Sequence, residues 1–181
     1  LTMLSRRAFL GTSALTAATA AAQSGSAPAR AVGPNSRVTV GMIAVGARAH
    51  ELLQAIQQCE ATEIVAVCDA YKGRVERAVQ RTGGRAKIVA DWREILKNKD
   101  IDAVTIASPD HWHKTHVLEA LKAGKDVYCE KPLTYTVEDG LEILAAVQQS
   151  GKLLQVGSQG MSSASQQQAR DIIRSGKLGK I

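Results

Sequence analysis

The chain has 181 residues, enough for one domain with a hydrophobic core of its own. Its composition, 45% hydrophobic and 22% charged residues, is typical of an ordinary α/β protein. The formal charge of +6 is spread along the chain without a basic stripe or interleaved aromatic residues, so we expect no nucleic-acid partner. The three cysteines are odd in number and match no metal-binding spacing, which argues against a disulfide framework; Cys68 and Cys129 lie near the ends of apolar runs and are expected to be small core residues.

Residues 1–30 are predicted to hold an export signal and the start of a linker that continues through residues 31–36. Arg6 and Arg7 precede a mildly apolar stretch that ends in a small-residue cleavage site, Ala20-Ala21-Ala22. The paired arginines resemble a twin-arginine signal, which predicts the twin-arginine export machinery as a partner and a periplasmic or cell-envelope location. The stretch is too short and too weakly apolar for stable membrane insertion. The alternative is an Ala-rich amphipathic helix, which would have little polar face.

The globular part is expected to begin with a buried strand from Arg37, a tight turn at Gly46 and a helix from Arg48. A dinucleotide pyrophosphate binds at such a turn, because the first helical N–H groups point at it and the helix dipole favours its charge. The usual G-x-G-x-x-G pattern is here Ala44-x-Gly46-x-x-Ala49, so only the middle glycine is kept. We assign the turn residues Ala44, Gly46, Ala47 and Arg48 to cofactor binding.

A second buried strand, from Thr62, ends at Asp69, near the spacing expected of the carboxylate that accepts the ribose hydroxyls of NAD. An acid at this position repels a 2′-phosphate, so NAD is favoured, while Lys72 and Arg74 nearby soften the preference and leave NADP open. The alternative role for Asp69, a cap of the helix over residues 71–81, is compatible with ribose binding.

The rest of the chain alternates between strands and helices, which predicts an α/β fold with a doubly wound parallel sheet. The expected strands cover residues 87–89, 102–107, 125–130 and 152–156, and the expected helices cover residues 92–97, 114–123, 137–149 and 164–174. Asp91 is expected to cap the helix at 92–97. In the helix at 137–149, helical spacing groups Leu141, Leu144, Ala145 and Gln148.

The loop after the strand at 102–107 contains Ser108-Pro109-Asp110-His111-Trp112-His113. A metal site built from His111, His113 and His116 lacks a carboxylate or cysteine at a convincing spacing, so no metal is predicted. Because ligands of doubly wound sheets bind at the carboxyl ends of the strands, Ser108 and His113 are expected to offer hydrogen bonds near the nicotinamide. The alternative is that Ser108 or Asp110 only caps the following helix.

Glu130-Lys131-Pro132 ends the next strand and therefore faces the same edge of the sheet. A lysine at this position can orient an alcohol, move its proton or place the nicotinamide amide, and partial desolvation would tune its pKa for proton transfer. Pro132 keeps the preceding Lys131 extended, which helps to aim it. The alternative is a surface turn with a solvated lysine.

Taken together, these motifs are similar to the Gfo/Idh/MocA family, the group of glucose–fructose oxidoreductase and inositol dehydrogenase. The motifs that carry the resemblance occur in order: Val-Gly-Met-Ile-Ala-Val-Gly-Ala-Arg, Cys-Asp, Ser-Pro-Asp-His-Trp-His, Glu-Lys-Pro-Leu and Gln-Val-Gly-Ser-Gln. The resemblance covers residues 37–181 and implies an NAD(P)-binding Rossmann domain at 37–160. It further implies that residues 161–181 lead into an α/β substrate domain that is missing from this chain.

The resemblance implies a sugar-like small-molecule substrate and allows a homo-oligomer of the full-length protein. It implies that Lys131 is the catalytic or nicotinamide-positioning lysine and that Asp69 contacts the adenosine ribose. Ser108, Pro109 and His113 would line the cofactor loop. Glu130 and Gln159 fall where the family often contacts cofactor or substrate.

Two departures concern the site itself. Ala44 and Ala49 replace glycines, and Gln159-Gly160-Met161 stands where many members have Gln-Arg-Arg. The function predicted from sequence is hydride transfer between NAD(P) and a sugar or polyol, with little turnover by this part alone. The alternatives are an NAD-dependent glycosidase that uses a transient oxidation, and a non-catalytic nucleotide-binding module.

Overall fold

The computed structural model describes residues 37–180. Six strands and six α-helices alternate along this part of the chain. The strands are β1 (Val38–Ile43), β2 (Thr62–Cys68), β3 (Lys87–Ile88), β4 (Ala103–Ile106), β5 (Asp126–Glu130) and β6 (Leu154–Gly157). The helices are α2 (Ala47–Gln57), α3 (Lys72–Arg81), α4 (Trp92–Lys97), α5 (His113–Lys122), α6 (Val137–Ser150) and α7 (Ala164–Arg174), with 3₁₀ turns η2 (Asp110–Trp112) and η3 (Gln159–Ser162).

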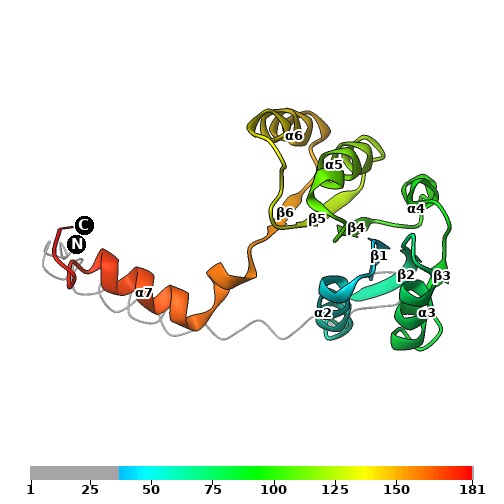
Figure 1. Ribbon diagram of the computed structural model, residues 1–181, viewed down its shortest axis with the longest axis horizontal. Helices are drawn as coiled ribbons and strands as arrows, with labels where there is room; N and C mark the ends of the chain where they lie inside the picture. The colour runs from blue at the N-terminus through cyan, green and yellow to red at the C-terminus, as the bar shows by residue number, and fades with distance from the viewer. Residues whose placement is uncertain (1–36, 181) are drawn as a thin grey trace, which may run out of the picture. The chain divides into compact units, whose positions relative to one another are not determined.

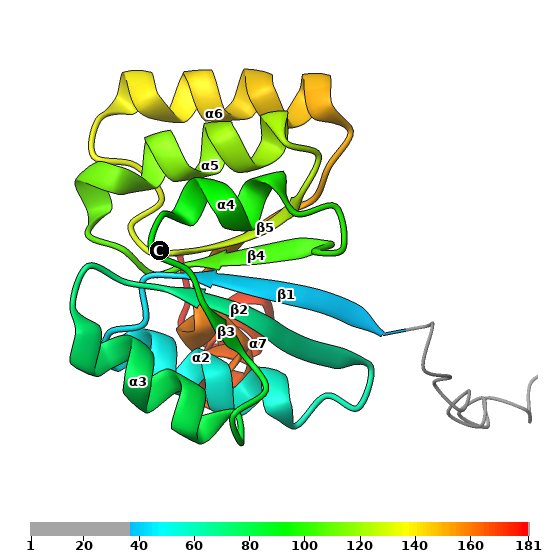
Figure 2. The same ribbon diagram turned by 90° about the vertical axis from the view of Figure 1, so that its right-hand side faces the viewer.

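All six strands are parallel and pair in the order β3-β2-β1-β4-β5-β6. The chain runs outward from β1 to β3, crosses to β4 and then runs outward to β6 (Figure 1). Since crossover connections are right-handed, the reversal puts α2 and α3 on one face of the sheet and α4, α5 and α6 on the other, as Figure 2 shows. The predicted doubly wound parallel fold is confirmed.

The core is aliphatic and has one part on each side of the sheet. Met42, Val45 and Leu53 are fully buried in the part that α2 and α3 cover, whereas Ile43 and Ile106 belong to the part on the side of α4 and α5. Such runs of β-branched and aliphatic residues suit strands buried on both faces, because neither face can hold a solvated polar side chain. Cys68 and Cys129 are both buried and free, which confirms them as core residues. Burial raises the pKa of their thiols to about 11 and about 12.

Local capping explains where several helices begin. Asp91 accepts a hydrogen bond from the Arg93 N–H and caps α4, as predicted. Thr136 and Asp139 form a capping box at the start of α6. Lys114 of α5 pairs with Asp139 at 3.0 Å, and this ion pair ties the two neighbouring helices together.

The predicted helix over residues 137–149 is confirmed as α6, but the residues grouped by helical spacing do not form its buried face. Leu141 and Leu144 are exposed, and the helix instead packs through Ile143, with Ala146 and Val147 beside it. This helix has apolar residues on two sides, so spacing alone does not say which side meets the sheet.

The predicted export signal and linker lie outside the described residues. Within residues 37–180, no helix combines the length and apolar character needed to span a bilayer.

Candidate functional site

The turn between β1 and α2 is held by main-chain bonds to the neighbouring strand. The Ala44 N–H donates to the Cys68 carbonyl at 2.8 Å, and the Val45 N–H donates to Asp69 Oδ2 at 2.8 Å. Ala44 has a φ of 63°, the left-handed conformation in which the family pattern places glycine. The turn therefore keeps the backbone path of a glycine-rich loop although an alanine occupies its strained position.

The N-terminus of α2 offers its backbone N–H groups to a ligand. Gly46 is the N-cap and provides no side-chain hydrogen bond, and no acidic residue lies in the first turn. The first amide groups of an α-helix have no partner inside the helix and carry the positive end of its dipole. A phosphate group placed before Gly46 and Ala47 would satisfy them.

Gly46 is not required by the packing of the protein itself. A Cβ atom built at this position meets only the Arg74 guanidinium, at 3.8 Å, and the Gly46 φ of −71° is open to any residue. At Gly41, by contrast, a Cβ would lie 2.3 Å from Ile95 Cγ2. The open space before Gly46 thus fits an incoming pyrophosphate, and a side chain would occupy that space.

Asp69 lies at the carboxyl end of β2 and joins two turns. Its Oδ2 accepts from the Val45 N–H, and its Oδ1 accepts from the Tyr71 N–H at 2.9 Å. Arg74 approaches the same carboxylate at 3.7 Å and also lies over the Tyr71 ring, 5.9 Å from its centroid. The Asp69 carboxylate is therefore fixed at the edge where a ribose would bind. Arg74 is the cation beside it, whereas the sequence indicated only that Lys72 and Arg74 lie nearby.

A cavity of about 380 Å³ opens between the ends of β1, β2 and β4. Asp69 and Arg74 line one side of it, and Ser108, Pro109 and Trp112 line the other. This is the point where the strand order reverses, and crevices at such points are the ligand sites of open α/β sheets. Ala44, Asp69, Ser108 and Pro109, all predicted cofactor residues, are therefore brought together.

Two tryptophans and a histidine form one wall of this cavity. The His116 ring stacks on Trp112 with centroids 5.5 Å apart, and its other side meets Trp92 edge-on at 4.7 Å. His116 Nδ1 lies 3.0 Å from Ser108 Oγ. Burial lowers the pKa of His116 to about 4, helped by the neighbouring His113 and Arg93, so the ring is neutral at physiological pH. Sequence reasoning considered His116 only as a metal ligand and did not connect Trp92 with the site.

His113 is buried and links the two loops that were predicted to face the cofactor. Its Nδ1 lies 2.7 Å from the Pro132 carbonyl oxygen, and its Nε2 lies 2.8 Å from the Ser108 carbonyl oxygen. Both ring nitrogens are therefore engaged by main chain, which places His113 behind the loops as a brace. Direct contact between His113 and the cofactor stays a prediction.

Glu130 is the centre of a buried polar network at the end of β5. Its Oε1 accepts from Arg48 Nε at 2.8 Å and from Gln159 Nε2 at 2.6 Å, while its Oε2 accepts from the Lys131 N–H at 3.3 Å. The bond to Glu130 raises the pKa of Arg48. Three of the predicted residues, Arg48, Glu130 and Gln159, thus meet, and Arg48 is held by carboxylates rather than left free for phosphate.

Lys131 follows this network and has an exposed side chain. Within residues 37–180, no hydrogen bond or ion pair engages its amine. The Lys131–Pro132 peptide bond is cis. The amine is thus available to a ligand, while the main chain on both sides is anchored through Glu130 and through the bond between His113 and Pro132.

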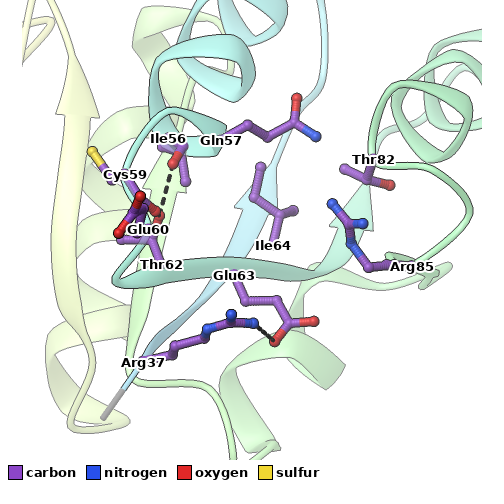
Figure 3. Close-up of a pocket in the computed structure, with 10 residues that line it drawn as sticks. All are labelled: Arg37, Ile56, Gln57, Cys59, Glu60, Thr62, Glu63, Ile64, Thr82 and Arg85. Atoms are coloured by element: carbon purple, nitrogen blue, oxygen red, sulfur yellow. Dashed lines mark hydrogen bonds and ion pairs between the residues drawn. The ribbon is translucent and has the colours of Figure 1, made fainter. Parts of the chain in front are cut away.

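A further hollow, of about 280 Å³, lies near the amino ends of β1 and β2 (Figure 3). Arg37 and Glu63 form an ion pair of 3.9 Å there, and Thr62 donates to the Ile56 carbonyl at 2.7 Å. None of the predicted cofactor residues lines this hollow. In the part of the chain that the structure describes, no three metal-ligating side chains cluster.

The fold and this edge define a dinucleotide-binding domain of the Rossmann type. A parallel sheet in the order 3-2-1-4-5-6, an uncapped helix N-terminus after β1 and an acid at the end of β2 are its features. The chain belongs to the Gfo/Idh/MocA oxidoreductase family with an NAD-binding Rossmann fold, whose family model matches residues 38–158. Its cofactor is accordingly NAD.

The relatives include inositol 2-dehydrogenase of Salmonella typhimurium, 31% identical over 142 residues, which are 77% of this chain and 42% of the relative. Inositol 2-dehydrogenase 3 of Saccharopolyspora erythraea is 34% identical over 145 residues, 78% of this chain and 42% of the relative. Among solved structures, an NAD-binding oxidoreductase from Klebsiella pneumoniae has a TM-score of 0.69 at 28% identity, over 79% of this chain and 40% of that one. The chain spans less than half the length of these relatives.

Proposed function

We propose that this chain forms the cofactor side of an oxidoreductase that moves a hydride between NAD and a hydroxyl-bearing carbon of a polyol or sugar. The observation that carries the proposal is the position of Lys131, a free amine at the end of β5 beside the strand that borders the cofactor cavity. The inositol 2-dehydrogenases among its relatives support a polyol as the substrate class.

Each part of the site has one role in this proposal. The turn at Gly46 and the first N–H groups of α2 bind the pyrophosphate, and Asp69 accepts the ribose hydroxyls. The chemistry that NAD supplies when bound is acceptance of a hydride. Lys131 in its neutral amine form hydrogen-bonds the substrate hydroxyl and takes up its proton as the carbonyl forms, becoming an ammonium group, while Glu130 and His113 hold the main chain around the lysine.

Calorimetry of the 181-residue chain with NAD tests the cofactor site. We expect saturable binding by the wild type and at least about a hundredfold weaker binding by Gly46→Val, because the valine fills the space that the pyrophosphate needs. The variant should unfold at nearly the wild-type temperature, since a Cβ there contacts only the flexible Arg74 side chain. Equal NAD affinity in a folded Gly46→Val protein would refute the placement of the phosphate.

Turnover measurements on a protein that contains this chain together with a substrate domain test the role of Lys131. With myo-inositol as the probe substrate, Lys131→Ala should lower kcat by about 10² to 10⁴, the usual contribution of a positioned proton-transfer group. NAD affinity should change far less, because Lys131 is not part of the phosphate or ribose site. Unchanged kcat in Lys131→Ala would remove the lysine from the reaction.

We also infer export by the twin-arginine route, which rests on Arg6 and Arg7 in the sequence. Cell fractionation of the wild type and of the double variant Arg6→Lys, Arg7→Lys tests it. A wild-type protein that stays in the cytoplasmic fraction would contradict the inference.

A further inference from the structure

One face of the sheet has a region without a helix. On the side of α2 and α3, these helices lie over β1, β2 and β3, whereas the helices next to β4, β5 and β6 lie on the opposite face (Figure 2). An apolar groove of about 670 Å³ results, here called the sheet groove. Its principal lining residues are Val40, Leu52, Ile56, Ala103, Val127 and Tyr128. Strands of parallel sheets are normally covered on both faces, so a groove of this composition calls for an occupant.

Helix α7 has a short apolar stripe that no other described residue buries. Ala169, Ile172 and Ile173 follow the i, i+3, i+4 spacing of one helix face. None of the residues of α7 is buried, and Ile173 is 50% exposed.

The chain delivers α7 to the mouth of the groove. Gln159 lines the sheet groove and is anchored to Glu130 at the carboxyl end of β5, shortly before α7 begins. The turn η3, which begins at Gln159, directly precedes α7. Eleven helical residues span about 16 Å, the same as the five extended residues of β5.

We propose that α7 packs back into the sheet groove of its own chain, with Ile172 and Ile173 against the strands. The helix then runs from the carboxyl edge to the amino edge of the sheet, alongside α2 and antiparallel to the strands, as helices of parallel sheets do. This packing completes the second helical layer. It holds whether or not the domain binds NAD.

Disulfide trapping tests the proposal, because Cys59 is exposed and lines the amino end of the groove. When α7 is seated, its last turn lies next to Cys59. We use Ser175→Cys and Lys177→Cys, which lie just beyond the last residue of α7, and Arg174→Cys, which lies on the helix face opposite the apolar stripe, as the matched control. All three positions are exposed, so the variants should fold.

Under mild oxidation, at least one of Ser175→Cys and Lys177→Cys should form an intramolecular disulfide with Cys59 about tenfold faster or more than Arg174→Cys. Adding Ile173→Asp should abolish the difference, whereas adding Gln167→Asp on the outer face should preserve it. Disulfide-linked dimers in place of the intramolecular bond would assign the groove to a second copy and overturn the proposal. Equal rates for all three cysteines would overturn it as well.

Discussion

Ala44 shows how a residue can depart from a motif while the backbone does not. Its φ of 63° lies in the region that disfavours residues with a Cβ by about 1–2 kcal/mol. Ala44→Gly relieves this strain but makes the unfolded chain more flexible, so the two effects nearly cancel. We expect the free energy of unfolding to change by less than about 1 kcal/mol.

Ala49→Gly is the matched control, because Ala49 is buried inside α2 and has no left-handed strain to lose. It should lower the free energy of unfolding by about 1 kcal/mol or more in urea titrations. If Ala44→Gly is as destabilising as Ala49→Gly, the left-handed turn is not under strain.

The site residues fall into two groups: those whose positions follow from local chain geometry, and those whose contacts depend on the tertiary fold. Asp69 and Gly46 could be predicted, because a strand end and a helix start fix their positions. The hydrogen bond between Arg48 and Glu130 joins residues 82 positions apart. A sequence pattern gives the spacing of residues along one element, but it does not give the side-chain contacts between distant elements. The packing of Trp92 on His116 was missed for the same reason.

At the scale of the elements, Glu130 couples α2, β5 and η3 through Arg48, Tyr128 and Gln159. Glu130→Gln keeps the size of the side chain but removes its charge and one acceptor oxygen. We expect a loss of about 1.5–3 kcal/mol in the free energy of unfolding, the usual value of hydrogen bonds to a charged group.

Glu51→Gln provides the comparison, since Glu51 pairs with the same Arg48 but is exposed. It should cost at most about 0.5 kcal/mol, as surface ion pairs contribute little. Urea unfolding of both variants measures the contribution of each carboxylate that pairs with Arg48. Equal losses in the free energy of unfolding would show that the buried bond to Glu130 stabilises the fold no more than the exposed pair with Glu51.

The order and type of the elements could be predicted from the sequence, because alternating apolar runs and turns suffice for a doubly wound sheet. Helix α4 and its cap Asp91 follow from local chemistry and were confirmed. The buried side of α6 could not be predicted, because Leu141 and Ile143 both belong to helical stripes and only the neighbouring helix selects between them. The sheet groove could not be predicted from the sequence either, because it depends on which helices lie on which face of the sheet.

For the molecule as a whole, two buried histidines predict sensitivity to mild acid. Burial lowers the pKa of His116 to about 4, and burial with the nearby Arg81 and Arg77 lowers the pKa of His50. The unfolded chain binds these protons more readily than the folded one, so stability is complete above about pH 6.5 and falls as the pH drops toward 4. His116 alone accounts for up to about 3 kcal/mol.

Urea titrations between about pH 7 and pH 5 measure this loss. In His116→Gln the slope of stability against pH should be clearly smaller. Asp91, Asp102 and Asp139 do not confuse the result, because their lowered pKa values matter only below the ordinary carboxyl pKa of 3.8. Stability that is independent of pH over this range would contradict the buried, neutral state of His116.

The bonds made by Asp69 have a thermodynamic consequence for cofactor binding. This carboxylate already fixes the turn after β1 and the turn after β2 through the Val45 and Tyr71 N–H groups. The proposed adenosine half of the site is therefore preorganised, and docking there should cost little conformational entropy in the loops. Adenosine alone should bind with an unfavourable entropy no larger than that of a rigid pocket.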